Sequence, residues 1–131
     1  MVSKITSQSR EEITEPKIEK RVISQETSNK LTSMLISVVE NGSARLAKIP
    51  GYYIAAKTGT AQIPKMEGGY YEDKSIQSAI GYFPALNPKF LVYVKLDDPK
   101  NSPSSGQSAV PIFKEIAEYA INLYQIPPDY Q

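Results

Sequence analysis

The alternation of side chains over residues 90–96 is the feature that most constrains the fold of this chain. Every second position there is apolar, and the positions between are largely apolar as well: Phe90, Val92, Val94 and Leu96 against Leu91, Tyr93 and Lys95. A period of two predicts a β-strand, and apolar residues in both sets predict a central strand covered on two sides. Residues 76–82 also alternate, and a proline-containing turn over residues 84–88 follows them. The two segments are therefore predicted to be neighbouring antiparallel strands.

A third strand is predicted over residues 51–62, which read Gly-Tyr-Tyr-Ile-Ala-Ala-Lys-Thr-Gly-Thr-Ala-Gln. Its first half holds aromatic and β-branched residues, which suit a pleated, half-buried surface. Its second half contains Lys57, Thr58, Gly59 and Thr60, which offer little apolar surface for packing. A glycine inside a strand is typical of a place where another backbone or a ligand comes close.

Two helices are predicted, one before and one after these strands. The first begins after Ser24, a favourable N-cap residue, carries Glu26 in its first turn and ends at Asn41-Gly42. The second runs from Ser108 towards Pro127-Pro128. Apolar residues recur at helical spacing on one face of both, and we expect the Met34 and leucine stripe of the first helix to be core rather than a ligand site. The sets are Thr27, Leu31, Met34, Leu35, Val38 and Val39 in the first helix, and Phe113, Ile116, Ala117, Ala120, Ile121 and Tyr124 in the second.

The other segments are predicted to be irregular. Residues 63–74 form a long loop that borders the end of the third strand, and residues 100–106 form a mobile loop rich in Ser, Pro and Gly. Tyr70 or Tyr71 of the long loop could cover a substrate, or could simply pack the loop onto the domain. The predicted fold class is α+β, an antiparallel sheet meander packed against an N-terminal and a C-terminal helix.

Composition excludes several classes of function. The 131 residues include neither cysteine nor histidine, so a zinc site of the usual kind and Ser/His or Cys/His catalytic pairs are excluded. A net charge of +1 gives no basic surface for nucleic acid. No apolar run approaches the roughly 20 residues that span a bilayer. Acid–base chemistry near neutral pH would have to use Lys, Tyr or a carboxylate, and we expect no metal and no cofactor.

Residues 57–60 carry groups that could bind an anionic, carbonyl-containing ligand. Lys57 supplies a positive charge whose pKa falls readily in a dry site. The hydroxyls of Thr58 and Thr60 can donate to a carboxylate, and backbone N–H groups beside Gly59 are open enough to point at a developing oxyanion. An exposed strand end with a solvated lysine explains the same four residues, so both interpretations stay open at this point.

Two other patterns have structural explanations. Gly51 and Lys57-Thr58 resemble a phosphate-binding loop, but Ala56 stands where its second glycine is required, and no helix pattern follows. The neighbouring carboxylates at Asp97-Asp98 are better explained by a strand that ends before Pro99 than by a catalytic pair.

In its setting, the tetrad resembles the third signature of the penicillin-binding protein transpeptidases, in particular the class B (monofunctional) type. Five further segments are similar to the family in the same order along the chain, and the resemblance is least clear over residues 1–20. These segments are residues 21–24 with the helix that ends at 42, residues 49–52, 79–85, 87–89 and 109–116.

The resemblance implies the penicillin-recognising serine transpeptidase fold, with the Lys-Thr-Gly strand at the edge of a sheet beside a cleft. It implies acyl transfer between stem peptides of peptidoglycan, which β-lactams mimic. Lys57 would supply positive potential and help proton transfer. Thr58 and Thr60 would hold the carboxylate of the substrate or β-lactam, and the Thr60 backbone N–H would form half of the oxyanion hole. We therefore expect Lys57 and Thr60 to be catalytic and Thr58, Gly59 and Thr60 to bind substrate.

The sequence departs from the family pattern in two signatures. Neither Ser-x-x-Lys, which supplies the nucleophile, nor Ser-x-Asn occurs in it. We therefore expect residues 1–131 to be one partial domain, the C-terminal portion of a transpeptidase domain that is inactive alone. Within it, residues 1–22 form an arm or hairpin, and residues 23–131 form a helix, three strands and a helix. The alternative is a stand-alone, non-catalytic binding or scaffold module derived from this fold.

The resemblance also implies where the complete protein acts and what it contacts. It would work on the extracytoplasmic (periplasmic) face of the cell membrane, held by an N-terminal anchor outside this sequence. Its partners would be stem peptides, β-lactams and the missing N-terminal portion of the same protein, with no nucleic acid among them. The uncovered sheet edge is a candidate contact for a dimer.

Overall fold

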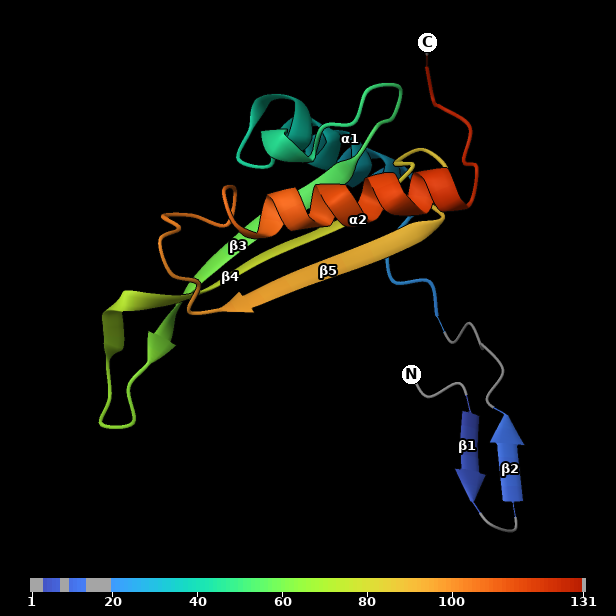
Figure 1. Cartoon of the computed structure of the whole chain (residues 1–131). Helices are drawn as coiled ribbons and strands as arrows, with labels where there is room; N and C mark the ends of the chain where they lie inside the picture. Colours follow the sequence, from blue (N-terminus) through green and yellow to red (C-terminus); the bar gives the residue numbers. More distant parts are fainter. Residues whose placement is uncertain (1–3, 8–9, 14–19, 131) are drawn as a thin grey trace.

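Three antiparallel strands between two helices form the centre of the structure (Figure 1). The computed structural model describes residues 4–7, 10–13 and 20–130. The order of the strands in this sheet is β3–β4–β5, which confirms the predicted α+β meander. In chain order the elements are β1 (Lys4–Ser7), β2 (Arg10–Ile13), α1 (Gln25–Asn41), the 3-10 helix η1 (Arg45–Ala47), β3 (Ala55–Pro64), β4 (Tyr70–Phe83), β5 (Phe90–Asp97) and α2 (Ala109–Leu123).

A separate two-stranded sheet is formed by β1 and β2, which pair antiparallel from Lys4 with Ile13 to Ser7 with Arg10. It lies within residues 1–22, for which the sequence predicts either an arm or a hairpin. Residues 1–3, 8–9, 14–19 and 131 lie outside the described residues, so the expected division of one partial domain between residues 22 and 23 stays a prediction.

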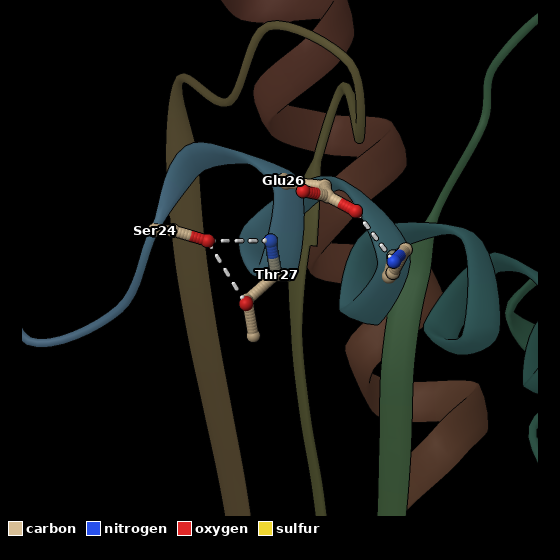
Figure 2. Close-up of polar contacts among 4 residues, drawn as sticks. Ser24, Glu26 and Thr27 are labelled. Carbon is tan, nitrogen blue, oxygen red and sulfur yellow. Dashed lines mark hydrogen bonds and ion pairs between the residues drawn. The ribbon is translucent and has the colours of Figure 1, made fainter.

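Helix α1 begins where the sequence predicts it, because Ser24 caps its first turn (Figure 2). The Ser24 hydroxyl accepts a hydrogen bond from the Thr27 backbone N–H at 3.1 Å. Glu26 lies in the same turn and accepts from Lys30 Nζ at 2.6 Å. Both interactions favour a helix that starts at this point. Within the described residues, no helix combines the length and apolar character that crossing a bilayer requires.

One apolar cluster joins α2, the end of α1 and one face of the sheet. Helix α2 crosses in front of the sheet in Figure 1, and its Phe113 ring meets the ring of Phe83 on β4 edge to face, 6.1 Å between centroids. Burial of this cluster is the main favourable contribution to folding. Its buried members are Val39, Ala44, Ala47, Ile49, Ile54, Ala56, Ala79, Phe83, Val94, Ala109, Val110, Phe113, Ala117 and Ile121.

Gly81 lets α2 approach the sheet this closely. A Cβ atom at position 81 would lie 2.7 Å from Phe113 Cζ and 2.8 Å from both the Ala55 carbonyl oxygen and Ala56 Cβ. Two of these three atoms belong to the backbone or to a buried methyl group on β3, which cannot move aside as a flexible side chain can. The position therefore requires glycine for packing.

The prediction that residues 90–96 form a central strand covered on two sides is wrong for the described chain. β4 is central, and β5 pairs with β4 alone among the described strands. Val94 lies in the core under α2, whereas Leu91 and Tyr93 on the other face are 69% and 59% exposed. The alternation indicates two faces that favour burial, but α2 covers only the first. Helix α1 reaches the second face at Tyr82, where the Thr32 hydroxyl lies 2.8 Å from the tyrosine hydroxyl, and leaves Leu91 and Tyr93 exposed.

The prediction that the apolar stripe of α1 lies in the core is also wrong in part, because elements that would cover the whole stripe are not among the described residues. Val39 is buried, but Leu31 is exposed and Met34 is 64% exposed. Of the apolar face predicted for the second helix, Phe113, Ala117 and Ile121 are buried, whereas Ile116 and the C-cap residue Tyr124 are exposed. Helical spacing identifies an apolar face, and how much of that face is covered depends on elements elsewhere.

The loop predicted over residues 63–74 is mostly strand. β3 continues to Pro64 and β4 already begins at Tyr70, so the connection is only residues 65–69. Gly68 and Gly69 make the turn with φ of +94° and +77°, a region that favours glycine. Pairing of Pro64 with Tyr70, beyond a register shift after Gln62, extends both strands into sequence that has no clear strand pattern.

The third strand begins at Ala55 rather than at residue 51. The segment before it pairs with the end of the chain instead: the Tyr53 N–H donates to the Asp129 carboxylate at 2.8 Å, and the Asp129 N–H donates to the Gly51 carbonyl at 2.8 Å. The Tyr52 hydroxyl donates to the Ile126 carbonyl at 2.7 Å. Residues 51–53 therefore hydrogen-bond to the C-terminal tail instead of extending the strand.

We expect Gly81→Ala to lower the free energy of unfolding by about 1–3 kcal/mol, the usual cost of overpacking a core. Chemical denaturation of the purified chain measures this. Glu72→Ala, an exposed position on the same strand, is the control and should change stability by less than about 0.5 kcal/mol. Equal stability of the two variants would contradict the packing argument for Gly81.

Candidate functional site

Residues 57–60 lie on β3, the strand at one edge of the three-stranded sheet. Lys57 is opposite Ile80 and Thr60 is opposite Gln77 on β4. Among the described strands, none pairs with the other side of β3. The backbone of β3 on that side is available to a ligand, which could add as a further strand.

The side chains of this segment point alternately to the two faces of the sheet. Thr58 and Thr60 are opposite Ala79 and Gln77, which are buried on the face that α2 covers. Lys57 points to the other face and is exposed. Lys57 and Thr58 therefore share no face, and the open edge is where both can meet one ligand.

The backbone of the segment presents the Thr60 N–H to the open edge. The Gly59 carbonyl lies on the β4 side, since the Ser78 hydroxyl of β4 donates to it at 3.4 Å. In a planar trans peptide the N–H points opposite to the carbonyl, so the Thr60 N–H points away from β4. The Thr58 carbonyl points to the same side of β3 as the Thr60 N–H, because the backbone groups of alternate residues in a strand point the same way. This carbonyl accepts a hydrogen bond from Lys57 Nζ at 2.8 Å.

Both threonine hydroxyls are held by serines from other parts of the chain. Thr58 Oγ1 lies 2.8 Å from Ser43 Oγ, in the segment after α1. Thr60 Oγ1 lies 2.5 Å from Ser105 Oγ, in the loop before α2, and the Ser105 hydroxyl also donates to the Gly59 carbonyl at 2.6 Å. Ser105 is 1% exposed, so its hydroxyl is shielded from water, whereas Ser43 and Thr60 are exposed.

A buried glutamine anchors the loop that carries Ser105. Gln77 of β4 is 2% exposed; its amide donates to the Ser102 carbonyl at 3.0 Å, and its side-chain oxygen accepts from the Ser108 hydroxyl at 2.5 Å. The Val110 N–H donates to the Ser105 carbonyl at 3.0 Å. The loop over residues 100–106, which the sequence predicts to be mobile, is therefore attached to the sheet on both sides of Ser105.

Sequence reasoning places residues 57–60 on one strand but misses Ser43, Gln77 and Ser105. All three belong to other segments, and isolated serines in loops carry no motif. The Ser-rich composition of residues 100–106 is the one available signal, and it is more typical of a flexible loop than of a docked one.

The other candidate residues have structural roles in the described chain. Asp97 pairs with Lys95 at 2.8 Å, and the hydrogen bond from Lys95 to Asp97 raises the pKa of the lysine. Asp98 pairs with Lys100 at 2.5 Å. Tyr71 lies under two lysine ammonium groups, with Lys74 Nζ 4.5 Å from the ring centroid. Within the described residues, no group of three or more acidic side chains could hold a metal ion.

The family model and the similar proteins of known sequence indicate the same family. Residues 1–118 match the description "Penicillin binding protein transpeptidase domain". The chain is similar to stage V sporulation protein D of Bacillus subtilis, 44% identical over 102 residues, which covers 77% of this chain and 16% of that protein. It is similar to penicillin-binding protein PbpB of Mycolicibacterium smegmatis, 38% identical over 117 residues, which covers 82% of this chain and 18% of that protein. The chain spans between 16% and 28% of the length of the curated relatives it matches.

Solved structures give the same result. Penicillin-binding protein 3 of Mycobacterium tuberculosis in complex with ampicillin is similar with a TM-score of 0.79 and 29% identity, over 91% of this chain and 28% of that chain. The apo transpeptidase domain of Burkholderia pseudomallei penicillin-binding protein 3 is similar with a TM-score of 0.76 and 31% identity, over 97% of this chain and 37% of that domain. The likeness extends to the sheet and both helices.

We expect Gln77→Leu to lower the free energy of unfolding by about 1–3 kcal/mol, because the change removes the hydrogen bonds that join the Gln77 amide to the Ser102 carbonyl and to the Ser108 hydroxyl. Hydrogen exchange should show faster exchange over residues 102–108, measured alongside chemical denaturation. Gln62→Leu on the exposed part of β3 is the matched control. Unchanged exchange in the Gln77 variant would show that another contact anchors the loop.

Proposed function

This chain belongs to the penicillin-binding protein transpeptidase family, and we propose that it supplies the substrate-binding strand of a peptidoglycan D,D-transpeptidase. It corresponds to the C-terminal part of a transpeptidase domain. The single observation that carries the proposal is the open edge of β3, where the Lys57 ammonium group contacts the outward Thr58 carbonyl and the Thr60 N–H points away from β4.

The proposed ligand is a stem peptide of peptidoglycan, bound along the open edge as an additional strand. Its carboxylate is held by the Thr58 hydroxyl and attracted by Lys57. The carbonyl that is attacked points its oxygen at the Thr60 N–H, and Gly59 leaves room for the backbone of the peptide. We propose that β-lactams occupy the same place; a similar protein, penicillin-binding protein 3 of Mycobacterium tuberculosis, was solved in complex with ampicillin.

The proposed reaction is acyl transfer. A serine attacks the peptide carbonyl, the terminal amine leaves with a proton, and the amine of a second peptide resolves the ester into a cross-link. The Thr60 N–H stabilises the negative charge on the oxygen, and each donor in such an oxyanion hole contributes about 3 kcal/mol to transition-state stabilisation. Lys57 aids proton transfer by its positive potential.

The nucleophile of this reaction is not provided by this chain. No Ser-x-x-Lys and no Ser-x-Asn occur in the sequence. We propose that another segment of the same protein supplies both and that the complete protein acts at the extracytoplasmic face of the membrane, as its family does. A non-catalytic binding module would have the same strand without the reaction, and labelling with penicillin separates the two.

We expect a fluorescent penicillin to form no covalent adduct with this chain alone, and to label a longer protein in which Ser-x-x-Lys and Ser-x-Asn precede residue 1. Denaturing gel electrophoresis after incubation detects the adduct. Substitution of the nucleophilic serine in the longer protein is the control. Labelling of the isolated chain would contradict the assignment of the nucleophile, and failure of every longer form to label would favour the non-catalytic module.

In a longer protein that labels, we expect Thr58→Val to lower the second-order acylation rate constant about 10–100-fold, because a hydrogen bond to a charged group contributes about 1.5–3 kcal/mol. Thr58→Ser keeps the hydroxyl and should retain most of the rate. Stopped-flow measurement with a chromogenic β-lactam gives the rate constants. Equal rates for Val and Ser at this position would remove Thr58 from carboxylate binding.

A further inference from the structure

We propose that Ser43, in the turn after α1, is a positioning residue for the hydroxyl of Thr58. It holds that hydroxyl in one orientation and supplies it with a hydrogen bond while Thr58 binds a carboxylate. The carboxylate part of this inference rests on the proposed function, whereas the contact between the two hydroxyls does not.

The contact selects one orientation of the Thr58 side chain. Ser43 Oγ lies 2.8 Å from Thr58 Oγ1 and comes from a segment 15 residues earlier. Opposite Thr58 on β4 lies Ala79, whose methyl group can neither donate nor accept a hydrogen bond. The χ1 angle of threonine has three staggered wells. Among the described residues, the Ser43 hydroxyl is therefore the group that distinguishes one well from the others by hydrogen bonding.

The backbone of Ser43 is held on two sides, which gives its hydroxyl a fixed starting point. The neighbouring Ala44 is fully buried, and its N–H donates to the Val38 carbonyl at 3.2 Å in the last turn of α1. On the other side, a Cβ atom at Gly106 would lie 2.7 Å from the Ser43 carbonyl oxygen. The loop before α2 thus lies directly against the turn that carries Ser43.

The direction of the hydrogen bond in a ligand complex follows from counting protons. Either hydroxyl can donate in the free chain. An ionised carboxylate only accepts, so Thr58 must give its single proton to a carboxylate that it binds. The contact with Ser43 then requires the Ser43 proton. The order of donors in the complex is Ser43 to Thr58 to carboxylate.

This order makes Thr58 a better donor to a negative charge than an isolated hydroxyl is. Hydrogen bonds in a chain polarise one another, and the hydroxyl is already oriented before the ligand arrives. Ser43 is exposed and Thr58 is half-buried, so a ligand can reach this pair of hydroxyls. Because Ser43 is exposed, water can take the place of its hydroxyl in a variant, and we expect a moderate effect on carboxylate binding.

The contact itself is tested on the isolated chain, labelled with ¹³C and ¹⁵N, by NMR. Three-bond couplings from the backbone ¹⁵N and carbonyl ¹³C to the methyl carbon of Thr58 measure its χ1 angle. In Ser43→Ala we expect these couplings to move towards an average over several staggered wells, whereas Ser43→Thr should keep the values of the parent. Ser104→Ala is the matched control, since its hydroxyl forms no hydrogen bond among the described residues. The couplings of Thr60, whose partner is Ser105, should stay unchanged in Ser43→Ala.

The consequence for carboxylate binding is tested in a longer protein that labels with penicillin. The probes are a chromogenic β-lactam and the methyl ester of its carboxylate, compared by stopped-flow acylation. Ser43→Ala should lower the second-order rate constant for the acid about 3–10-fold, the range of one neutral hydrogen bond, and leave that for the ester unchanged. Ser43→Thr should keep the acid-to-ester ratio of the parent. A merely structural role would lower both rate constants by the same factor.

Each outcome decides one of the two ideas. Thr58 couplings in Ser43→Ala that equal those of the parent would overturn the positioning role. Altered couplings with an unchanged acid-to-ester ratio would overturn its consequence for carboxylate binding. If no longer protein labels with penicillin, the proposed function fails together with that consequence, while the NMR result still decides whether Ser43 positions Thr58.

Discussion

The antiparallel pairing of β3 with β4 is the constraint on which the rest of the structure depends. Its register places Gly81 opposite Ala56, where Phe113 of α2 packs against the sheet, and it places Gly59 opposite Ser78. The same pairing uses one side of β3 and leaves the other side open. Core packing at one end of the strand and ligand access at the other are therefore set by a single alignment.

Polar contacts from three distant segments complete the edge. Ser43 follows α1, Ser105 precedes α2, and both contact threonines of β3 on the face that α2 covers. The buried amide of Gln77 connects the loop of Ser105 to the centre of the sheet. Because Gln77 and Ser105 are buried, the geometry of the edge at Thr60 is coupled to the packing of the loop before α2 and is not a local property of residues 57–60.

Exposed apolar side chains on β5 and α1 account for the errors in the predicted core. Leu91 and Tyr93 on β5 and Met34 on α1 have apolar side chains in positions that favour burial, yet they are exposed in the described chain. Large exposed apolar patches usually mark a surface that another element or partner covers.

The sequence by itself determined the types of the main elements and the location of the candidate site. Period-two alternation, the Ser24 cap and the Lys-Thr-Gly tetrad depend on neighbours in the chain, so they can be interpreted locally. Only the tertiary structure decided that β5 has one covered face, that residues 70–74 are strand, and that Ser105 holds Thr60. Those facts depend on contacts between segments far apart in the sequence, such as Gly59 and Ser105, and no local pattern specifies the distance between two such segments.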